Sequence, residues 1–242
     1  MKNIILVLGF LFCSYLVRAQ DENDTTYTIQ SFLYNWNHPE NGNAKLLDSV
    51  DQMVVVFREH YRDIKVAGVE KSNGVWSLSL APVRASIGRN GLIYDIAKKE
   101  GDGCTPVGLY ILGELFSYEK AVDTKLPYTQ TNEQDKWIDD TSSLDYNKYI
   151  RGETTAKSFE HLLLKSIDYK YCMVIEYNTT PVVTGKGSAI FFHVATDTYK
   201  PTSGCVAIAQ KDMEKFLKWF KPKKQKSIMI KGLIKGLFFD VK

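Results

Sequence analysis

The chain has 242 residues, of which 31 are lysine or arginine and 28 are aspartate or glutamate, giving a net charge of +3. A net charge this small argues against a nucleic-acid-binding protein that works through a basic field. The length fits one domain with a single sizeable core better than it fits two domains.

The first 19 residues predict a secretory signal peptide. Lys2 supplies a positive start, residues 4–17 form an apolar run, and Ala19 is a small residue suited to cleavage. The run is too short for a comfortable membrane span and no later segment is apolar enough, so we expect no stable membrane insertion. Cleavage would remove Lys2 and Arg18, leaving 31 − 2 = 29 basic residues against 28 acidic ones and a net charge of +1.

Three cysteines follow the predicted signal peptide: Cys104, Cys172 and Cys205. Exported proteins usually tie their cysteines into disulfides, and an odd number leaves at least one thiol unpaired within the chain. An unpaired thiol outside the cytoplasm is most simply explained as a catalytic nucleophile.

Strand patterns dominate the first half of the chain after a polar tail. Residues 20–45 are predicted to form that tail, and residues 46–242 are predicted to form the folded domain. Apolar alternation on both sides of Asn73-Gly74 predicts a β-hairpin, the strongest short-range signal in the sequence. The predicted strands, in chain order, are residues 53–57, 64–69, 75–80, 84–87, 92–96, 108–112, 171–177, 189–194 and 227–230.

Helical patterns are few. Residues 159–167 predict a short helix, and residues 211–220 predict another with Met213, Phe216, Leu217 and Phe220 on one face. Residues 115–160 are polar and aromatic without a clear period, which is typical of a lid or substrate-contact loop. Because strands outnumber helices and do not alternate with them, we expect a mainly β fold, an antiparallel sheet or β-sandwich with a few peripheral helices.

A histidine and a cysteine stand close together in the last quarter of the chain. His193 lies near the end of a predicted apolar strand, and Cys205 follows one short polar loop later. Gly204 permits a tight turn and a close approach of substrate to the backbone. We therefore predict Cys205 as nucleophile, His193 as its base, and the amides of Gly204 and Cys205 as oxyanion donors. Ser203 would either donate to the oxyanion or shape the turn.

Ordinary alternatives exist for these residues. A single cysteine is usually a small buried apolar residue, and a single histidine is usually a satisfied core or surface residue. A zinc site is disfavoured because no second cysteine or histidine stands at ligand spacing, and no cofactor is expected. Gly101-Asp102-Gly103 lacks the length of a phosphate-binding or calcium-binding loop, so a tight turn between strands is favoured there.

Three longer motifs surround the histidine and the cysteine. They are Gly88-Arg89-Asn90-Gly91, the run Lys-Glu-Gly-Asp-Gly-Cys-Thr-Pro-Val-Gly at residues 99–108, and Gly-Ser-Ala-Ile-Phe-Phe-His at residues 187–193 with Ser-Gly-Cys-Val-Ala at residues 203–207. In this order they resemble motifs of the L,D-transpeptidase catalytic domain, also called the YkuD domain. Shorter matches occur at residues 125–128, 137–140, 145–147, 160–162 and 176–178, so the resemblance runs from about residue 50 to about residue 231.

The resemblance implies a function in cell wall biogenesis and cell shape. Enzymes of that family use the cysteine to attack the carbonyl on the L-centre of diaminopimelate in a peptidoglycan tetrapeptide stem, with the histidine as base, and release D-alanine. An amine then captures the acyl-enzyme to form a crosslink or a lipoprotein attachment, or water captures it to leave a tripeptide. The resemblance therefore implies peptidoglycan stem peptides as partners and a place in the periplasm or cell envelope, after secretion across the inner membrane.

Three functions remain open at this point: an L,D-transpeptidase as the leading hypothesis, an L,D-carboxypeptidase using the same dyad, and a non-catalytic peptidoglycan-binding module. Two positions depart from the family pattern, since many transpeptidases have an arginine after the cysteine and a glycine after the histidine. This chain has Val206 and Val194 there. The role of that arginine toward a substrate carboxylate or the oxyanion would then pass to another cation. The candidates are Arg89, Lys98, Lys99 and Lys186.

Two further residues are expected near the substrate. Trp137 is predicted to form a wall of the substrate groove, beside the solvated pair Asp139 and Asp140. Asn178 follows a predicted strand and would orient His193 or an adjacent loop, although asparagine at a strand end more often forms a turn.

Overall fold

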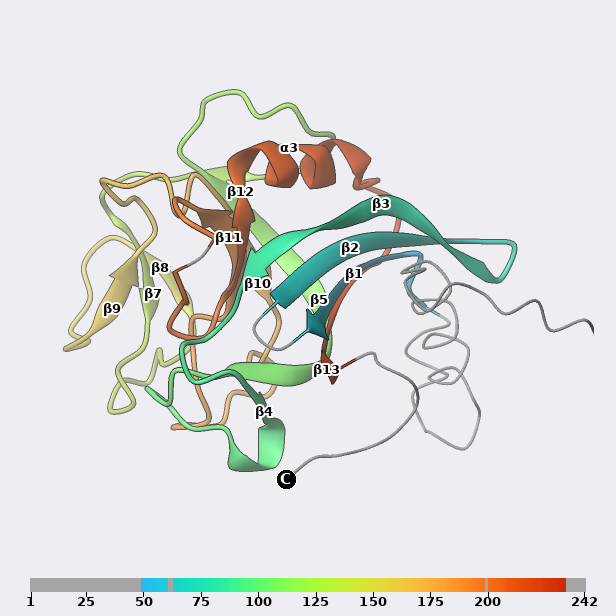
Figure 1. The fold of residues 1–242 in the computed structure, drawn as a ribbon. Helices are drawn as coiled ribbons and strands as arrows, with labels where there is room; N and C mark the ends of the chain where they lie inside the picture. Colours follow the sequence, from blue (N-terminus) through green and yellow to red (C-terminus); the bar gives the residue numbers. More distant parts are fainter. Residues whose placement is uncertain (1–48, 61–62, 199, 234–242) are drawn as a thin grey trace, which may run out of the picture.

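The computed structural model describes residues 49–60, 63–198 and 200–233, which form the body drawn in colour in Figure 1. The predicted signal peptide and the polar tail lie outside the described residues. Within the described part, thirteen strands, one α-helix and one 3₁₀ turn follow one another. The expectation of a mainly β fold is therefore confirmed.

The helices and strands are numbered in chain order, with the labels used in Figure 1. The strands are β1 (Gln52–His60), β2 (Asp63–Ser72), β3 (Val75–Ser86), β4 (Leu92–Tyr94), β5 (Thr105–Ser117), β6 (Thr129–Gln130), β7 (Asp135–Ile138), β8 (Tyr149–Arg151), β9 (Phe159–His161), β10 (Tyr171–Ile175), β11 (Phe191–Ala195), β12 (Val206–Ala209) and β13 (Lys226–Leu233). The 3₁₀ turn η2 is Asp95–Ala97, and the helix α3 is Gln210–Trp219.

Ten of these strands form one large sheet in the order β10-β11-β12-β3-β2-β1-β13-β5-β4, with β6 beside β5. β5 is long enough to pair with β13 through residues 108–111 and with β10 through residues 112–117, so the pairings close into a circuit. Most pairs are antiparallel, but β1–β13, β11–β12, β4–β5 and β5–β6 are parallel. The sheet is thus mixed, and the expected antiparallel sandwich is not confirmed.

The predicted hairpin is present between β2 and β3. Ser72 pairs with Val75, and the two residues between them, Asn73 and Gly74, have φ angles of 50° and 78°. Two central residues with positive φ make the turn that matches the twist of the flanking strands. Asn-Gly tolerates this backbone better than other residue pairs, which is why the sequence signal was correct.

Several predicted boundaries were wrong. The strand predicted at residues 84–87 is the end of the longer β3, and the one predicted at residues 92–96 stops at Tyr94, where η2 begins. The helix predicted at residues 159–167 does not form: Phe159–His161 is strand β9, paired with β7. A three-residue strand is too short to show its period, so its pairing partner decided the outcome.

Residues 115–160 are also more ordered than a structureless loop. They contain β6, β7 and β8, and a second sheet forms in the order β8-β7-β9. Asp135 of β7 lies at the centre of this small sheet and accepts hydrogen bonds from Tyr149 and from the Arg151 guanidinium, with atom separations of 2.6–2.9 Å. These partners hold the pKa of the Asp135 carboxyl below its ordinary value, although burial by itself would raise it.

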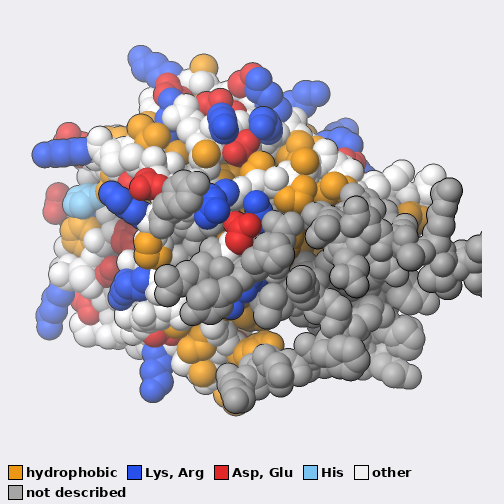
Figure 2. Space-filling view, in the orientation of Figure 1, with side chains coloured by type: hydrophobic (Ala, Val, Ile, Leu, Met, Phe, Trp, Pro, Cys, Tyr) orange, Lys and Arg blue, Asp and Glu red, His pale blue; other side chains and the backbone are white. Residues whose placement is uncertain are grey.

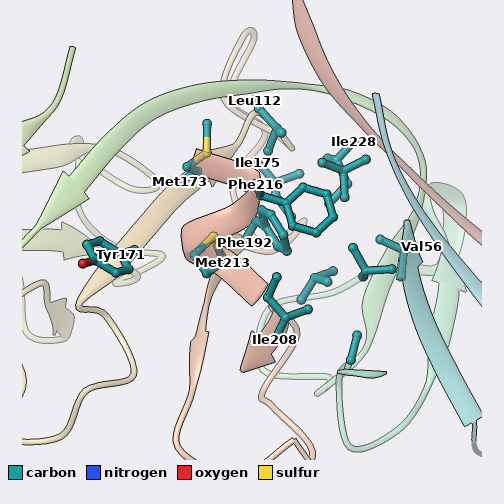
Figure 3. Close-up of a cluster of buried hydrophobic side chains, with 14 of the residues drawn as sticks. Val56, Leu112, Tyr171, Met173, Ile175, Phe192, Ile208, Met213, Phe216 and Ile228 are labelled. Carbon is teal, nitrogen blue, oxygen red and sulfur yellow. The ribbon is translucent and has the colours of Figure 1, made fainter. Parts of the chain in front are cut away.

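The helix predicted at residues 211–220 is α3, and its apolar face packs on the large sheet as expected. Met213, Phe216 and Leu217 are buried in the central cluster of Figure 3 together with Phe192 of β11, whose ring meets that of Phe216 edge-on at 5.8 Å. Each fully buried apolar side chain of this size stabilises the fold by about 1.5–3 kcal/mol. The helix therefore closes one face of β11 and β12.

The opposite face of β10, β11 and β12 is covered by the small sheet. A separate buried cluster forms there from Phe116, Trp137, Leu162, Tyr169, Cys172, Val174, Ala189, Phe191 and Cys205. Because successive strand residues point to opposite faces, Phe192 and Val194 enter the central cluster, while Phe191 and His193 face the small sheet. Burial on both faces explains why this strand is a continuous apolar run.

The surface carries both charges in mixture. On the described part of the face in Figure 2, lysine and arginine side chains lie among aspartate and glutamate side chains. Within the described residues, no helix is long and apolar enough to cross a membrane.

Phe216→Ala should destabilise the domain by about 3–5 kcal/mol, because it leaves a cavity between α3 and the sheet that the neighbouring rings cannot fill. Urea unfolding of the purified protein measures the change. Lys211→Ala on the exposed face of the same helix is the control and should change the unfolding free energy by less than about 0.5 kcal/mol. Equal effects of the two substitutions would contradict the packing assigned to α3.

Candidate active site

β11 and β12 bring the predicted nucleophile and base to one cavity. The strands are parallel, with Phe192 opposite Val206 and His193 opposite Ala207, so Cys205 stands one residue before the paired segment. His193 and Cys205 both line a cavity of about 740 Å³. The predicted site residues Ser203, Gly204 and Arg89 line the same cavity.

The turn before Cys205 is anchored by a buried threonine that sequence analysis did not single out. The Thr105 hydroxyl accepts a hydrogen bond from the Gly88 amide at 2.8 Å and donates one to the Gly204 carbonyl at 2.7 Å. A β-carbon on Gly88 would lie 2.3 Å from the Gly103 carbonyl oxygen, so only glycine fits there. The motif around Gly88 and the motif around Cys205 therefore depend on each other through Thr105.

The Cys205 thiol is held by main-chain groups at the start of β11 and just before it. Its sulfur accepts a hydrogen bond from the Phe191 amide at 3.4 Å and donates one to the Ala189 carbonyl at 3.3 Å. Ala189 has a φ of 52°, a strained conformation for a residue other than glycine. The Ala189 amide in turn donates to the Asn147 side-chain oxygen at 3.1 Å, which helps to hold this conformation.

Asn147 links the small sheet to the site. Its side-chain oxygen also accepts the Trp137 indole N–H at 2.8 Å, and its amide donates to the carbonyls of Tyr177 and Asn178 at 3.1 and 2.7 Å. The residue is buried and has a φ of 57°, which asparagine tolerates better than most residues. Asp145-Tyr146-Asn147 was among the shorter family-like segments, but nothing in the sequence indicated which contacts Asn147 would make.

Burial raises the pKa of the Cys205 thiol above its ordinary value, and the Glu160 carboxylate raises it further. The free protein therefore holds a neutral thiol, whose S–H points at the Ala189 carbonyl oxygen, rather than a thiolate. A cysteine can be activated as a nucleophile in two ways, and a lowered thiol pKa is the first of them. The structure leaves the other way, a neighbouring base that takes the proton during attack.

His193 is arranged to be that base. Its Nδ1 lies 2.7 Å from the Val194 carbonyl and 2.9 Å from the Asp168 carbonyl, and both oxygens can only accept. The proton of the neutral ring is therefore on Nδ1, which leaves Nε2 free to accept one. Burial lowers the pKa of His193, so the ring is neutral at physiological pH. Among the described residues, Cys205 and His193 make no direct hydrogen bond, so attack requires the thiol to turn from Ala189 toward the ring.

The two predicted oxyanion donors differ in their availability. The Gly204 amide donates to the Thr202 hydroxyl at 3.1 Å, and the same hydroxyl donates to the Cys205 carbonyl at 2.7 Å. Within the described residues, the Cys205 amide donates no such hydrogen bond in the loop that precedes β12. The Cys205 amide is therefore the donor that stands ready for a developing oxyanion.

Of the four candidate cations Arg89, Lys98, Lys99 and Lys186, only Arg89 and Lys98 line the described cavity. The Arg89 guanidinium donates to the Ser203 hydroxyl at 3.1 Å and to the Gly101 carbonyl at 3.5 Å. Lys98 is only 3% exposed and its ammonium forms an ion pair with Asp102 at 2.8 Å. Asp102 also accepts the amides of Lys99 and Cys104, as expected of a tight turn.

The other three predicted contact residues lie outside the lining of the cavity. Trp137 is buried, with its ring edge-on to that of Phe191 at 5.3 Å, so it packs against β11. The Asn178 side chain bonds to Val183 and Gly187 and shapes the turn between them. The Lys186 ammonium bonds to the carbonyls of Asp95 and Ile96 in η2.

All three described cysteines are free and buried. Cys172, in β10, lies opposite His193 in the sheet and is fully buried, which raises its pKa well above the ordinary value. Within the described residues, no three or more histidine, cysteine, aspartate or glutamate side chains are grouped to hold a metal ion.

Comparison with known proteins gives one finding. A family model described as the L,D-transpeptidase catalytic domain (YkuD) matches residues 52–229. Neither the curated proteins nor the solved structures contain a significant match to this chain.

Alkylation of Cys205 by iodoacetamide should have its midpoint above pH 9.0, because burial and Glu160 both disfavour the thiolate. Glu160→Gln removes one of the two causes and should move the midpoint to lower pH, whereas Glu133→Gln on the exposed surface should not. Peptide mapping by mass spectrometry follows the modification of Cys205 separately from the other thiols. A midpoint below that of a free cysteine peptide would contradict this account.

Thr105→Val should destabilise the domain by about 1–3 kcal/mol, because the buried Gly88 amide and Gly204 carbonyl both lose their partner. Thr105→Ser retains the hydroxyl and is the matched control, with most of the stability kept. Thermal unfolding monitored by circular dichroism compares the two variants. Equal melting temperatures for Val and Ser would show that the hydroxyl contributes nothing.

Proposed function

The chain belongs to the family of L,D-transpeptidase catalytic domains, and from this premise we propose that it is a cysteine L,D-transpeptidase of the cell envelope that acts on peptidoglycan tetrapeptide stems. The observation that carries the proposal is the arrangement of the two predicted catalytic residues. A thiol and a neutral imidazole with a free Nε2 line one cavity, and within the described residues the Cys205 amide donates no hydrogen bond in the loop that precedes β12.

The acylation step follows from this arrangement. The Cys205 sulfur attacks the carbonyl carbon that precedes the terminal D-alanine, while His193 Nε2 takes the thiol proton. The carbonyl oxygen becomes an oxyanion and accepts a hydrogen bond from the Cys205 amide. As the C–N bond breaks, the imidazolium returns its proton to the departing amine, which leaves D-alanine in solution and a thioester on Cys205.

The second step reverses the roles. An amine attacks the thioester carbon, His193 takes the proton that the amine loses, and the sulfur departs as the thiol on recovering that proton. A new amide bond is then present and the enzyme returns to its starting state. Water in place of the amine gives a carboxylate and a tripeptide, so the L,D-carboxypeptidase alternative uses the same residues.

Burial of the dyad supports catalysis of acyl transfer. A neutral thiol beside a neutral imidazole is stable without substrate, which protects the cysteine from oxidation in the cell envelope. The imidazolium that forms during attack would be stabilised by the Asp168 and Val194 carbonyls at Nδ1. The Asp168 carboxylate also favours a positive ring, and the pKa of that carboxyl lies below its ordinary value because hydrogen bonds to Ser166 and Thr196 outweigh its desolvation.

Wild-type protein incubated with purified tetrapeptide muropeptides should release D-alanine, and mass spectrometry should detect crosslinked dimers. Cys205→Ala should lose at least about 10³-fold of this activity, as expected when a nucleophile is removed. Cys104→Ser is the matched control, because it alters another buried thiol and leaves Cys205 in place.

The products decide among the three hypotheses. Dimers support the transpeptidase, and tripeptides without dimers support the carboxypeptidase. Binding of muropeptides without any product from the wild-type protein would overturn both enzymatic functions in favour of the binding module.

A further inference from the structure

Five carboxylates line the cavity that contains Cys205, and three of them, Glu100, Asp139 and Glu160, lie close together. Glu100 lies in the turn before β5, Asp139 directly follows β7, and Glu160 belongs to β9. They come from three separate segments of the chain. Glu100 and Asp139 are close enough to Glu160 that their charges raise the pKa of its carboxyl, in addition to the larger effect of burial.

The neighbours of these carboxylates are neutral hydroxyl groups. Tyr169 donates to Glu160, and both Tyr146 and Ser188 donate to Glu100, the latter at 2.7 Å. One oxygen of Asp139, Oδ1, is buried and has no hydrogen-bond partner among the described residues. A buried carboxylate oxygen without a partner carries a large desolvation cost, which a bound donor would offset.

The described part of the protein does not neutralise these three carboxylates with a paired cation. Among the described residues, none of the three carboxylates forms an ion pair. Two of the cations that line the cavity already have partners: the Lys98 ammonium is paired with Asp102, and the Arg89 guanidinium donates to Ser203 and Gly101. Three like charges gathered in a cavity favour a cation that enters with the ligand.

The geometry suits an organic cation better than a metal ion. Within the described residues, no three carboxylate, thiol or imidazole groups are close enough together to ligate one ion. A primary ammonium has three N–H donors and can satisfy acceptors that are more widely spread. The cavity, at about 740 Å³, also has room for the chain that carries such a group to the reacting carbonyl.

We propose that Glu160, Asp139 and Glu100 form an ammonium-binding subsite, which holds a primary ammonium group of the peptide that reacts at Cys205. This inference rests on the proposed function. The ammonium would belong either to the donor stem, on the side chain of its diamino residue, or to the acceptor, where it loses a proton to a base before the resulting amine attacks the thioester. The chemistry recognised is the same in both cases.

The subsite would also couple binding to reactivity. Tyr169 donates its hydroxyl to Glu160, while its ring lies edge-on to His193 at 5.0 Å and to Phe191 at 5.6 Å. Glu160 is one of the groups that hold the Cys205 thiol neutral. An ammonium bound at Glu160 offsets that negative charge and makes loss of the thiol proton easier once substrate is present.

The test compares tetrapeptide stems whose side-chain ammonium is free with stems in which it is acetylated. D-alanine release gives kcat and KM for the wild-type protein, for Glu160→Gln and Asp139→Asn, and for the exposed control Glu133→Gln. Glu160→Gln should raise KM for the free stem by at least about tenfold, a loss of about 1.4 kcal/mol. KM for the acetylated stem should stay within about twofold, which shows that the variant is folded.

A second arm locates the source of the ammonium. The mass of acylated Cys205 in a single turnover measures the donor step, and the dependence of dimer formation on an acceptor stem, free or acetylated, measures the capture step. An effect of Glu160→Gln confined to the donor step assigns the ammonium to the donor, and an effect confined to capture assigns it to the acceptor. Either result supports the subsite.

Equal responses of free and acetylated stems in every arm would overturn it, with the carboxylates then serving only the fold. If the wild-type protein releases no D-alanine, the proposed function fails instead. Titration calorimetry with free and acetylated stems, on the wild type and Glu160→Gln, then decides the subsite separately. A preference for the free stem that Glu160→Gln abolishes supports it, and no such preference overturns it.

Discussion

The parallel pairing of β11 with β12 is the constraint on which the rest of the site depends. It sets Phe192 against Val206 and His193 against Ala207, so that the histidine and the cysteine face the same cavity. The strands keep this register because both of their faces are buried, one under α3 and the other under the small sheet. A shift by one residue would exchange the two faces and remove His193 from the site.

Burial has opposite consequences for the two groups of the dyad, and both favour the neutral form. It raises the pKa of the thiol and lowers that of the imidazole, so both groups are uncharged in the free protein. The Glu160 carboxylate strengthens this preference, since its charge disfavours the thiolate. A substrate that brings a positive charge close to Glu160 would offset this effect. The thiol would then lose its proton more easily at the step in which it attacks.

Local patterns predicted the local features well. The Asn73-Gly74 hairpin and the amphipathic helix α3 were both correct, because backbone conformation at Asn-Gly and the 3.6-residue period depend on neighbouring residues alone. The helix predicted at residues 159–167 was wrong for the complementary reason. Its first residues pair with β7, more than twenty positions earlier, and nothing within the segment records that partner.

The sequence by itself determined the family, the mainly β class and the two residues expected to react, since these depend on residue types and their order along the chain. Only the tertiary structure decided how those residues are poised. The Ala189 carbonyl that holds the thiol, the Asp168 carbonyl that orients the histidine and the carboxylates of Glu100, Asp139 and Glu160 come from separate segments. Main-chain carbonyls are present at every residue, and electrostatic effects depend on distance and burial, so neither leaves a signature in the sequence.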